Sequence, residues 1–243
     1  MSKRVVVNQH YEDYWDLTMA WTDYTGDKFN KALQIIVNFI DDEINPSVGL
    51  TPKLYQSLQA KLTETMNIDG ASIRKGINQF FKLGFIDNKG KSYHRLTKIF
   101  LQCTDNEEKR IIYSKIMYEN ASFSRSKDNV TTINEIEFLI KTLEECGSID
   151  REDLLALMFT KIQYQPKGFL TKDEIQNKKQ ELIANGAYSR KYNQHSYLFG
   201  LCKTLTGVSV SGTKISLNAD LEIEKKKNLK VEIRIYNIFT RWN

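Results

Sequence analysis

The sequence predicts a mainly helical fold with short β-hairpins, an α+β class, built from two tandem winged helix-turn-helix units. Three observations lead to this prediction. Apolar residues recur every three or four positions over much of the chain, as in amphipathic helices. Turn-forming residues separate short strand-like segments. The order of a Leu-Thr cap, helix, turn, helix and hairpin occurs twice, from residue 50 and again from residue 170.

The first unit contains three expected helices and a hairpin. Residues 27–43 place apolar side chains at helical spacing, and Asn45-Pro46 follows as a stop. Thr51-Pro52 suits the start of a second helix that runs to Met66. A third helix is expected from Gly70 to Leu83. Strand-like residues 85–87 and 93–96 then flank a basic turn. Aromatic residues near the N-terminus could stack on bases, but we expect them to pack an N-terminal arm against this unit; they are Tyr11, Tyr14, Trp15 and Trp21.

The second unit repeats this order after a helical stretch. Helices are expected over residues 107–120, 133–146 and 150–162. Thr171, with acids at 173 and 174, caps a helix over 172–184, and another helix covers 189–205. Residues 208–210 and 214–217 form the second hairpin. The polar segment 122–129 is the expected boundary between a domain of residues 1–121 and a domain of residues 122–243.

Composition limits the class of protein. The chain has 243 residues and is 41% hydrophobic, which is enough for a packed core. No apolar run approaches the ~20 residues that cross a bilayer, so we expect a cytoplasmic protein without a membrane partner. Cys103, Cys146 and Cys202 lie too far apart for a zinc ribbon or a disulfide framework. The net charge of +5 is modest, but basic residues cluster near the expected third helices and the hairpins.

Each expected third helix carries Arg-Lys followed closely by Asn-Gln. Arginine and lysine donate to guanine, and asparagine and glutamine pair with adenine. In the first helix, the stripe of Ile73, Ile77 and Phe80 leaves the polar residues on the opposite face. The second helix aligns only after a one-residue shift, and Lys191 falls on its buried side unless the helix begins later. The residues predicted to read bases are Lys75, Asn78, Gln79, Lys82, Asn193, Gln194 and Ser196.

Residues beside these helices and hairpins are expected to contact phosphates. Basic hairpin tips commonly do so, although they equally serve to discourage strand pairing. A solvated helix face is the simpler alternative for any one of these polar residues. The predicted phosphate contacts are Ser72, Arg74, Lys89, Lys91, Arg95, Arg125, Ser189, Arg190, Lys191, Lys203 and Lys214.

No active site is recognisable in the sequence. The three histidines are isolated, and no GxxxxGK[ST] loop is present, so neither a metal nor a nucleotide partner is expected. Glu224-x-Lys226 has the spacing of a metal-dependent nuclease site, but the upstream acid, Asp220, lies too close. We therefore expect no catalytic residue and no cofactor in this chain. The oligomeric state is left open.

Several of these segments resemble the N-terminal DNA-recognition region of a group of type II restriction endonucleases. The resemblance covers roughly residues 11–217. It implies sequence-specific binding of double-stranded DNA by a tandem helical module that precedes a separate nuclease domain. Because no cleavage motif follows, we expect a recognition fragment, for which magnesium matters only if a nuclease domain is attached. The segments that carry the resemblance are residues 72–86, 122–126, 136–143, 168–171 and 190–194, and the positions matching readers are Lys75, Asn78, Gln79, Asn193 and Gln194.

Three other functions remain open. A tandem winged-helix regulator or plasmid replication initiator would bind a palindromic or repeated site. A complete nuclease would use acids around Glu222 and Glu224, and its cutting would depend on magnesium. A protein–protein adaptor would bind no DNA.

Overall fold

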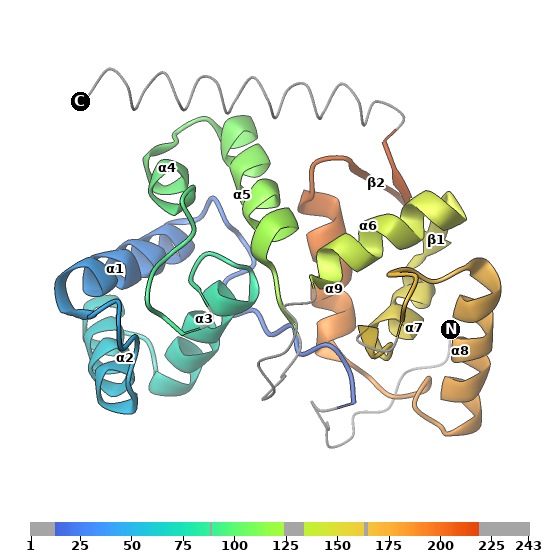
Figure 1. Cartoon of the computed structure of the whole chain (residues 1–243), viewed down its shortest axis with the longest axis horizontal. Helices are drawn as coiled ribbons and strands as arrows, with labels where there is room; N and C mark the ends of the chain where they lie inside the picture. The colour runs from blue at the N-terminus through green and yellow to red at the C-terminus, as the bar shows by residue number, and fades with distance from the viewer. Residues whose placement is uncertain (1–12, 88, 124–133, 163–164, 219–243) are drawn as a thin grey trace. The chain divides into compact units, whose positions relative to one another are not determined.

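The computed structural model of the chain describes residues 13–87, 89–123, 134–162 and 165–218, and these divide into two compact units (Figure 1). We call Met19–Ala121 together with Leu205–Gly207 the N-terminal module. The C-terminal module consists of residues 13–18, the described part of 122–204, and residues 208–218. The fold is mainly helical with one small antiparallel sheet, which confirms the predicted α+β class. Among the described helices, none combines the length and apolar character that a bilayer crossing requires.

The core of the N-terminal module is aromatic. Phe29, Phe80, Phe85, Phe100 and Tyr113 are all fully buried, and their ring centroids lie 4.9 to 6.2 Å apart. Edge-to-face and tilted ring pairs of this kind stabilise a core beyond the area they bury. Four of the rings come from the helices α1 (Asp27–Glu43), α3 (Gly70–Lys82), α4 (Thr97–Gln102) and α5 (Asn106–Asn120), and Phe85 follows α3. The remaining helix, α2 (Pro52–Met66), packs against α1 and α3.

A three-residue turn joins α2 to α3. Thr51 caps α2 with its hydroxyl, which accepts from the Leu54 amide, and Pro52 occupies the first turn. The helix ends at Asn67, whose φ of 52° is left-handed. Asp69 then caps α3 by accepting from the amides of Ala71 and Ser72 at 3.0 and 2.9 Å. A turn this short fixes the direction of α3 relative to α2.

The predicted first hairpin is smaller than expected. Its only strand pairing is a single bridge between Ile86 and Tyr93 within the described residues, instead of two strands over 85–87 and 93–96. The chain turns into α4 at Thr97, a short helix that the sequence analysis missed. The hydroxyl of Thr97, the first residue of α4, donates to the Phe85 carbonyl at 3.0 Å, so this helix begins beside the residues expected to form the first strand.

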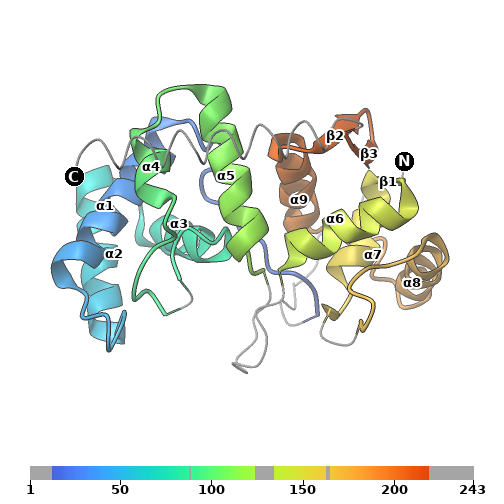
Figure 2. The ribbon, with the colours of Figure 1, turned by 45° about the horizontal axis from the view of Figure 1, so that its top comes forward.

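The C-terminal module places helices against a three-stranded antiparallel sheet (Figure 2). The strand order is β1-β3-β2, and Ile215 at the centre pairs with Ile149 on one side and Val210 on the other. The helix α6 contacts β1 and β3, and α9 contacts β2. The elements are α6 (Glu135–Cys146), β1 (Ser148–Asp150), the 3-10 helix η1 (Arg151–Asp153), α7 (Leu154–Met158), α8 (Lys172–Ala184), α9 (Asn193–Thr204), β2 (Val208–Ser211) and β3 (Lys214–Leu217).

Residues 13–18 belong to the C-terminal module, although the sequence analysis placed them in the domain of residues 1–121. The Trp15 amide donates to the Met158 carbonyl at 2.9 Å, and its indole donates to the Thr160 carbonyl at 3.2 Å. The Trp15 ring also packs on Phe123 and Phe138. The expectation that Trp15 packs against the first unit was therefore wrong.

Two helices of the C-terminal module are shorter than predicted. α7 covers Leu154–Met158 instead of 150–162, because β1 and η1 occupy the residues before it. α9 begins at Asn193 instead of 189. By contrast, α8 has the predicted bounds, since Thr171 and Glu174 form a reciprocal capping box.

Candidate nucleic-acid interface

The outer face of α3 is a stripe of basic and amide side chains. Arg74, Lys75 and Asn78 are exposed, and Lys82 is half-buried. At 100° per residue these four positions fall within roughly 100° of one another around the helix axis. No acidic residue occurs in Gly70–Lys82. Because Arg74, Lys75 and Asn78 are exposed on one face of a helix whose own sequence holds no acid, α3 offers hydrogen-bond donors to an anionic partner. Together with Lys82 on the same face, we call these residues the α3 stripe.

The opposite face of α3 is held rigidly. Ile73, Ile77 and Phe80 are fully buried. Gly76 faces Trp21 so closely that a Cβ at this position would lie 2.2 Å from an indole carbon. A helix that is packed this tightly positions its outer side chains well, because it cannot rotate without breaking core contacts.

Gln79 is not on the outer face, so the prediction that it reads bases was wrong. Its side chain is fully buried. The Gln79 Oε1 atom accepts from the amides of Ala20 and Trp21 at 2.8 and 3.0 Å, and Nε2 donates to the Trp21 carbonyl at 2.6 Å. Gln79 therefore fixes residues 20–21 to the side of α3. The sequence does contain a signal for the burial of Gln79. The glycine one turn earlier, Gly76, indicates that another segment packs closely against that side of the helix.

The turn after Asp87 extends the basic surface beside the end of α3. The Asp87 carboxylate accepts from the amides of Lys89, Lys91 and Ser92 at 2.7 to 3.0 Å. Burial by itself raises the pKa of Asp87, but the hydrogen bonds from the Ser92 hydroxyl and from these amides outweigh it, so the pKa is lowered. A Cβ on Gly90, where φ is +59°, would lie 3.4 Å from the Phe81 ring, so the turn adjoins the last turn of α3. Lys89 is exposed, and the Lys91 ammonium donates to the Ser47 carbonyl at 3.2 Å.

Arg95 and its neighbour His94 share one carboxylate. Arg95 lies 3.0 Å from Glu119, and the His94 Nε2 atom lies 2.9 Å from the same side chain. Since the Leu96 amide donates to Nδ1, the neutral ring carries its proton on Nε2 and donates to Glu119. Burial lowers the pKa of His94, and Glu119 opposes that shift. A phosphate contact by Arg95 would compete with Glu119.

The matching residues of the C-terminal module lie in a different setting. Ser189, Arg190 and Lys191 precede α9 and are not part of it, and the Ser189 hydroxyl donates to the Gly186 carbonyl at 3.0 Å. Asn193, Ser196 and Lys203 are exposed on the outer face of α9, and Lys214 is exposed on β3. The Arg151 guanidinium donates to Ser196 at 3.4 Å, while Arg151 and Lys203 both lie within 5 Å of the Phe199 ring centre.

Gln194 is also buried, and the prediction that it reads bases was wrong. Only 3% of its surface is exposed, and its Oε1 atom has no hydrogen-bond partner. The two glutamines of the Asn-Gln pairs thus face the interior in both modules. Ser72 is half-buried near the start of α3. Tyr11, Arg125, Glu222, Glu224 and residues 225–227 lie outside the described residues.

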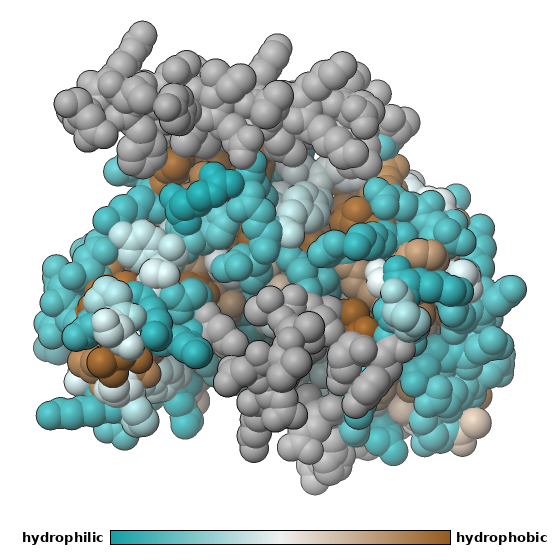
Figure 3. All heavy atoms as spheres, viewed as in Figure 1, coloured by the Kyte–Doolittle hydropathy of each residue, from teal (hydrophilic) through white to brown (hydrophobic). Residues whose placement is uncertain are grey.

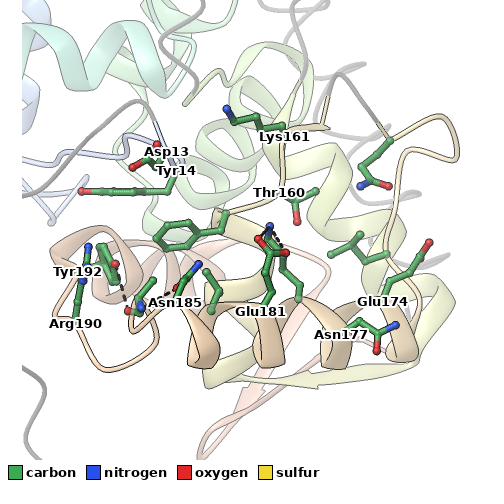
Figure 4. Close-up of a pocket in the computed structure, with 16 residues that line it drawn as sticks. Asp13, Tyr14, Thr160, Lys161, Glu174, Asn177, Glu181, Asn185, Arg190 and Tyr192 are labelled. Atoms are coloured by element: carbon green, nitrogen blue, oxygen red, sulfur yellow. Dashed lines mark hydrogen bonds and ion pairs between the residues drawn. The ribbon is translucent and has the colours of Figure 1, made fainter.

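A groove in the C-terminal module was not anticipated from the sequence. It has a volume of about 760 Å³ and runs along α8, with Tyr14, Phe159 and Tyr192 among its lining residues (Figure 4). Its residues come from three separate parts of the chain, and local sequence patterns do not indicate such a juxtaposition. On the face shown in Figure 3, most of the coloured surface is hydrophilic.

No three histidine, cysteine or acidic side chains gather into a possible metal site within the described residues. Comparison of the chain with protein-family models, curated proteins and solved structures finds no match.

Proposed function

We propose that this protein recognises double-stranded DNA in a sequence-specific manner, with α3 of the N-terminal module in the major groove. The observation that carries the proposal is the α3 stripe, which combines cationic and amide side chains on one exposed face. An α-helix fits the major groove, where lysine pairs with guanine and asparagine with adenine. The short turn between α2 and α3 supports the same docking, because a helix-turn-helix presents its second helix in this way.

The contacts divide into two classes. Lys75 and Asn78 lie on the exposed side of α3 and would read base edges. Arg74 on the flank, together with Lys89 in the adjoining turn, would contact phosphates and fix the register. The Asp87 carboxylate keeps its charge, but its hydrogen bonds to three backbone amides hold its oxygens against the turn.

The C-terminal module supports a second, weaker contact. Its order of helix, strand, helices and hairpin, with strands arranged β1-β3-β2, is consistent with a winged helix whose recognition helix is α9. The outer face of α9 offers Asn193 and Ser196, with Lys203 as the basic residue that the sequence analysis assigned to it. We expect this face to add less binding free energy than α3 does.

The resemblance to restriction endonucleases extends the proposal to the biological role. In that interpretation this chain supplies target recognition, and cleavage with magnesium belongs to an attached nuclease domain. A transcription regulator or replication initiator would use the same α3 stripe on a palindromic or repeated target. The symmetry of the bound site therefore separates these roles.

Selection from a pool of random duplexes by the whole chain tests the proposal. We expect enrichment of a defined site, and binding that weakens as salt is raised. Asn78→Ala should cost about 1–3 kcal/mol on that site and relax the preference at one base pair. The matched control is Lys98→Ala, which removes a lysine of the same module that is already paired with Asp41 at 2.9 Å. No enriched site, or unchanged preference in Asn78→Ala, would refute the assignment to α3.

A further inference from the structure

The groove of the C-terminal module has the size and shape of a small-ligand site. Its volume of about 760 Å³ lies within the range of protein ligand pockets. One wall is α8, which contributes Glu174, Asn177 and Glu181, and the other contains Thr160 and Lys161 (Figure 4). The groove is lined only by residues of the C-terminal module, so its chemistry can be examined apart from α3.

One end of the groove is an aromatic surface. The ring centroids of Tyr14, Phe159 and Tyr192 lie 5.0 to 5.3 Å from one another. Tyr14 and Tyr192 are buried, and the Tyr192 hydroxyl donates to the Ala187 carbonyl at 3.3 Å, whereas Phe159 is partly exposed. Phe159 is thus the ring of this cluster most open to the groove, supported by two fixed tyrosines. Such a surface suits a flat, unsaturated group.

The two carboxylates of α8 that line the groove interact with their own neighbours. Glu181 lies 2.9 Å from Lys178. Glu174 accepts from the Thr171 amide at 2.8 Å, which lowers its pKa, and it lies 3.6 Å from Lys167. These acids are committed to the helix cap and to ion pairs, so the field in the groove is set by the remaining charges.

The remaining charges are Lys161, Arg190 and Asp13. Within the described part of the chain neither Lys161 nor Arg190 forms an ion pair. Arg190 lies beside Tyr192 at the aromatic end of the groove (Figure 4), and a guanidinium is well suited to phosphate. Asn177 on α8 adds an amide that can donate to and accept from the edge of a base.

We propose that this groove binds a nucleotide, with the base against Phe159 and the phosphate at Arg190. Two sources share this chemistry, a free mononucleotide and a nucleotide turned out of bound DNA. The second source rests on the proposed DNA-binding function, and the first does not. The absence of a glycine-rich phosphate loop led the sequence analysis to expect no nucleotide partner, but stacking on an aromatic surface needs no such loop.

The test uses the whole chain and two probes. The first probe is deoxyadenosine monophosphate, titrated calorimetrically. The second is a duplex of the selected site carrying 2-aminopurine at successive positions, because the fluorescence of this base increases when it leaves the stack. Arg190→Ala and Phe159→Leu should each weaken binding of a responding probe about 5- to 100-fold. Lys172→Ala is the matched control, since it removes an exposed lysine of α8 that does not line the groove.

Each outcome decides the proposal. Binding of the free nucleotide that depends on Arg190 and Phe159 supports it with a soluble source, and 2-aminopurine fluorescence with the same dependence supports it with DNA as the source. The proposal is overturned if neither probe gives a binding signal. It is also overturned if a probe binds equally well to Arg190→Ala and Phe159→Leu while the melting temperatures of both variants match that of the control. If the duplex does not bind at all, the DNA-binding function fails, but calorimetry with the free nucleotide still tests the groove.

Discussion

The two modules present different chemistry on corresponding helices. The outer face of α3 is cationic, with Arg74 and Lys75 exposed within the helix. The corresponding basic pair of the C-terminal module, Arg190 and Lys191, lies before α9, whose first turn carries Asn193 and Ser196 instead. Similar residue types therefore lie on a helix in one module and in a loop in the other. Recurrence of residue types along a sequence does not by itself define equivalent binding surfaces.

The comparison also separates the roles that we propose. The α3 stripe is convex and suits a groove in DNA, whereas Arg190 contributes to a concave site beside aromatic rings. If this division is correct, substitutions on α3 change the binding of duplex DNA, and substitutions in the groove change the binding of a nucleotide.

The largest effect is expected at Gln79, and the other buried glutamine, Gln194, provides the contrast. Gln79→Ala leaves the Trp21 amide and carbonyl and the Ala20 amide without their partner, and should lower the free energy of unfolding by about 2–4 kcal/mol. Gln194→Leu removes an oxygen that has no partner, and should change stability by less than about 1 kcal/mol in either direction. Urea denaturation of both variants measures the contrast. Equal losses at the two positions would contradict it.

DNA affinity should respond to α3 more than to α9. Lys75→Ala should weaken binding of the selected duplex by about 1–3 kcal/mol, because Lys75 lies almost directly opposite the buried stripe of α3 and so points outward. Lys203→Ala should cost less, since the Lys203 ammonium lies 4.8 Å from the Phe199 ring centre, where cation–π attraction holds it. Fluorescence anisotropy at two salt concentrations compares them. A larger loss in Lys203→Ala would make α9 the principal reader.

The stability of the N-terminal module should fall in mild acid. Burial lowers the pKa of His94 below its usual 6.5, so the folded state keeps the neutral ring while the unfolded chain takes up a proton. Stability is therefore full above about pH 6.5 and decreases as the pH falls toward the lower folded pKa. Denaturation midpoints at pH 7.5 and 5.5 measure the change. His94→Gln should reduce the difference, and an unaltered difference would assign the effect to another group.

The smallest effects concern the cysteines, which report on each module separately. Burial raises the pKa of Cys202 to about 12 and also raises the pKa of Cys146, and both thiols are buried in the C-terminal module. Cys103 in the N-terminal module is partly exposed. Burial raises the pKa of Cys103 as well, which slows its reaction. In the native protein at pH 8, we expect Cys103 to react first with a disulfide reagent and the other two thiols only as the C-terminal module opens. Rapid reaction of all three would show that this module is poorly packed.

Local sequence signals were sufficient for much of the fold. α1 and α8 have their predicted bounds, because amphipathic spacing and capping residues act within a few positions. β1 was missed, since three residues show no periodicity and Ile149 finds its partner, Ile215, far along the chain. The short helix α4 was also missed, because it is kept in place by the burial of Thr97 and Phe100 in the core and not by a local sequence pattern.

The candidate site was predicted less completely. Helical phase predicts that Lys75 and Asn78 are exposed, and both side chains are exposed in the structure. Gln79 lies at the edge of the apolar stripe, and only the close packing of Trp21 against Gly76 shows that this edge is covered. The groove of Tyr14, Phe159 and Tyr192 joins segments that are about 145 and 33 residues apart, so no local pattern could reveal it.

The position of Trp15 affects the order in which the chain can fold during synthesis. The indole of Trp15 donates to a carbonyl 145 residues later, whereas the residues of the N-terminal module between them form a continuous segment. Closing a loop of that length costs about 4 kcal/mol of chain entropy. On the ribosome, the segment from Met19 to Ala121 is complete while Trp15 still lacks its partners. The first described residues to be synthesised are thus among the last to be buried, and a fragment that begins after Ala121 would lack the tryptophan that covers its core.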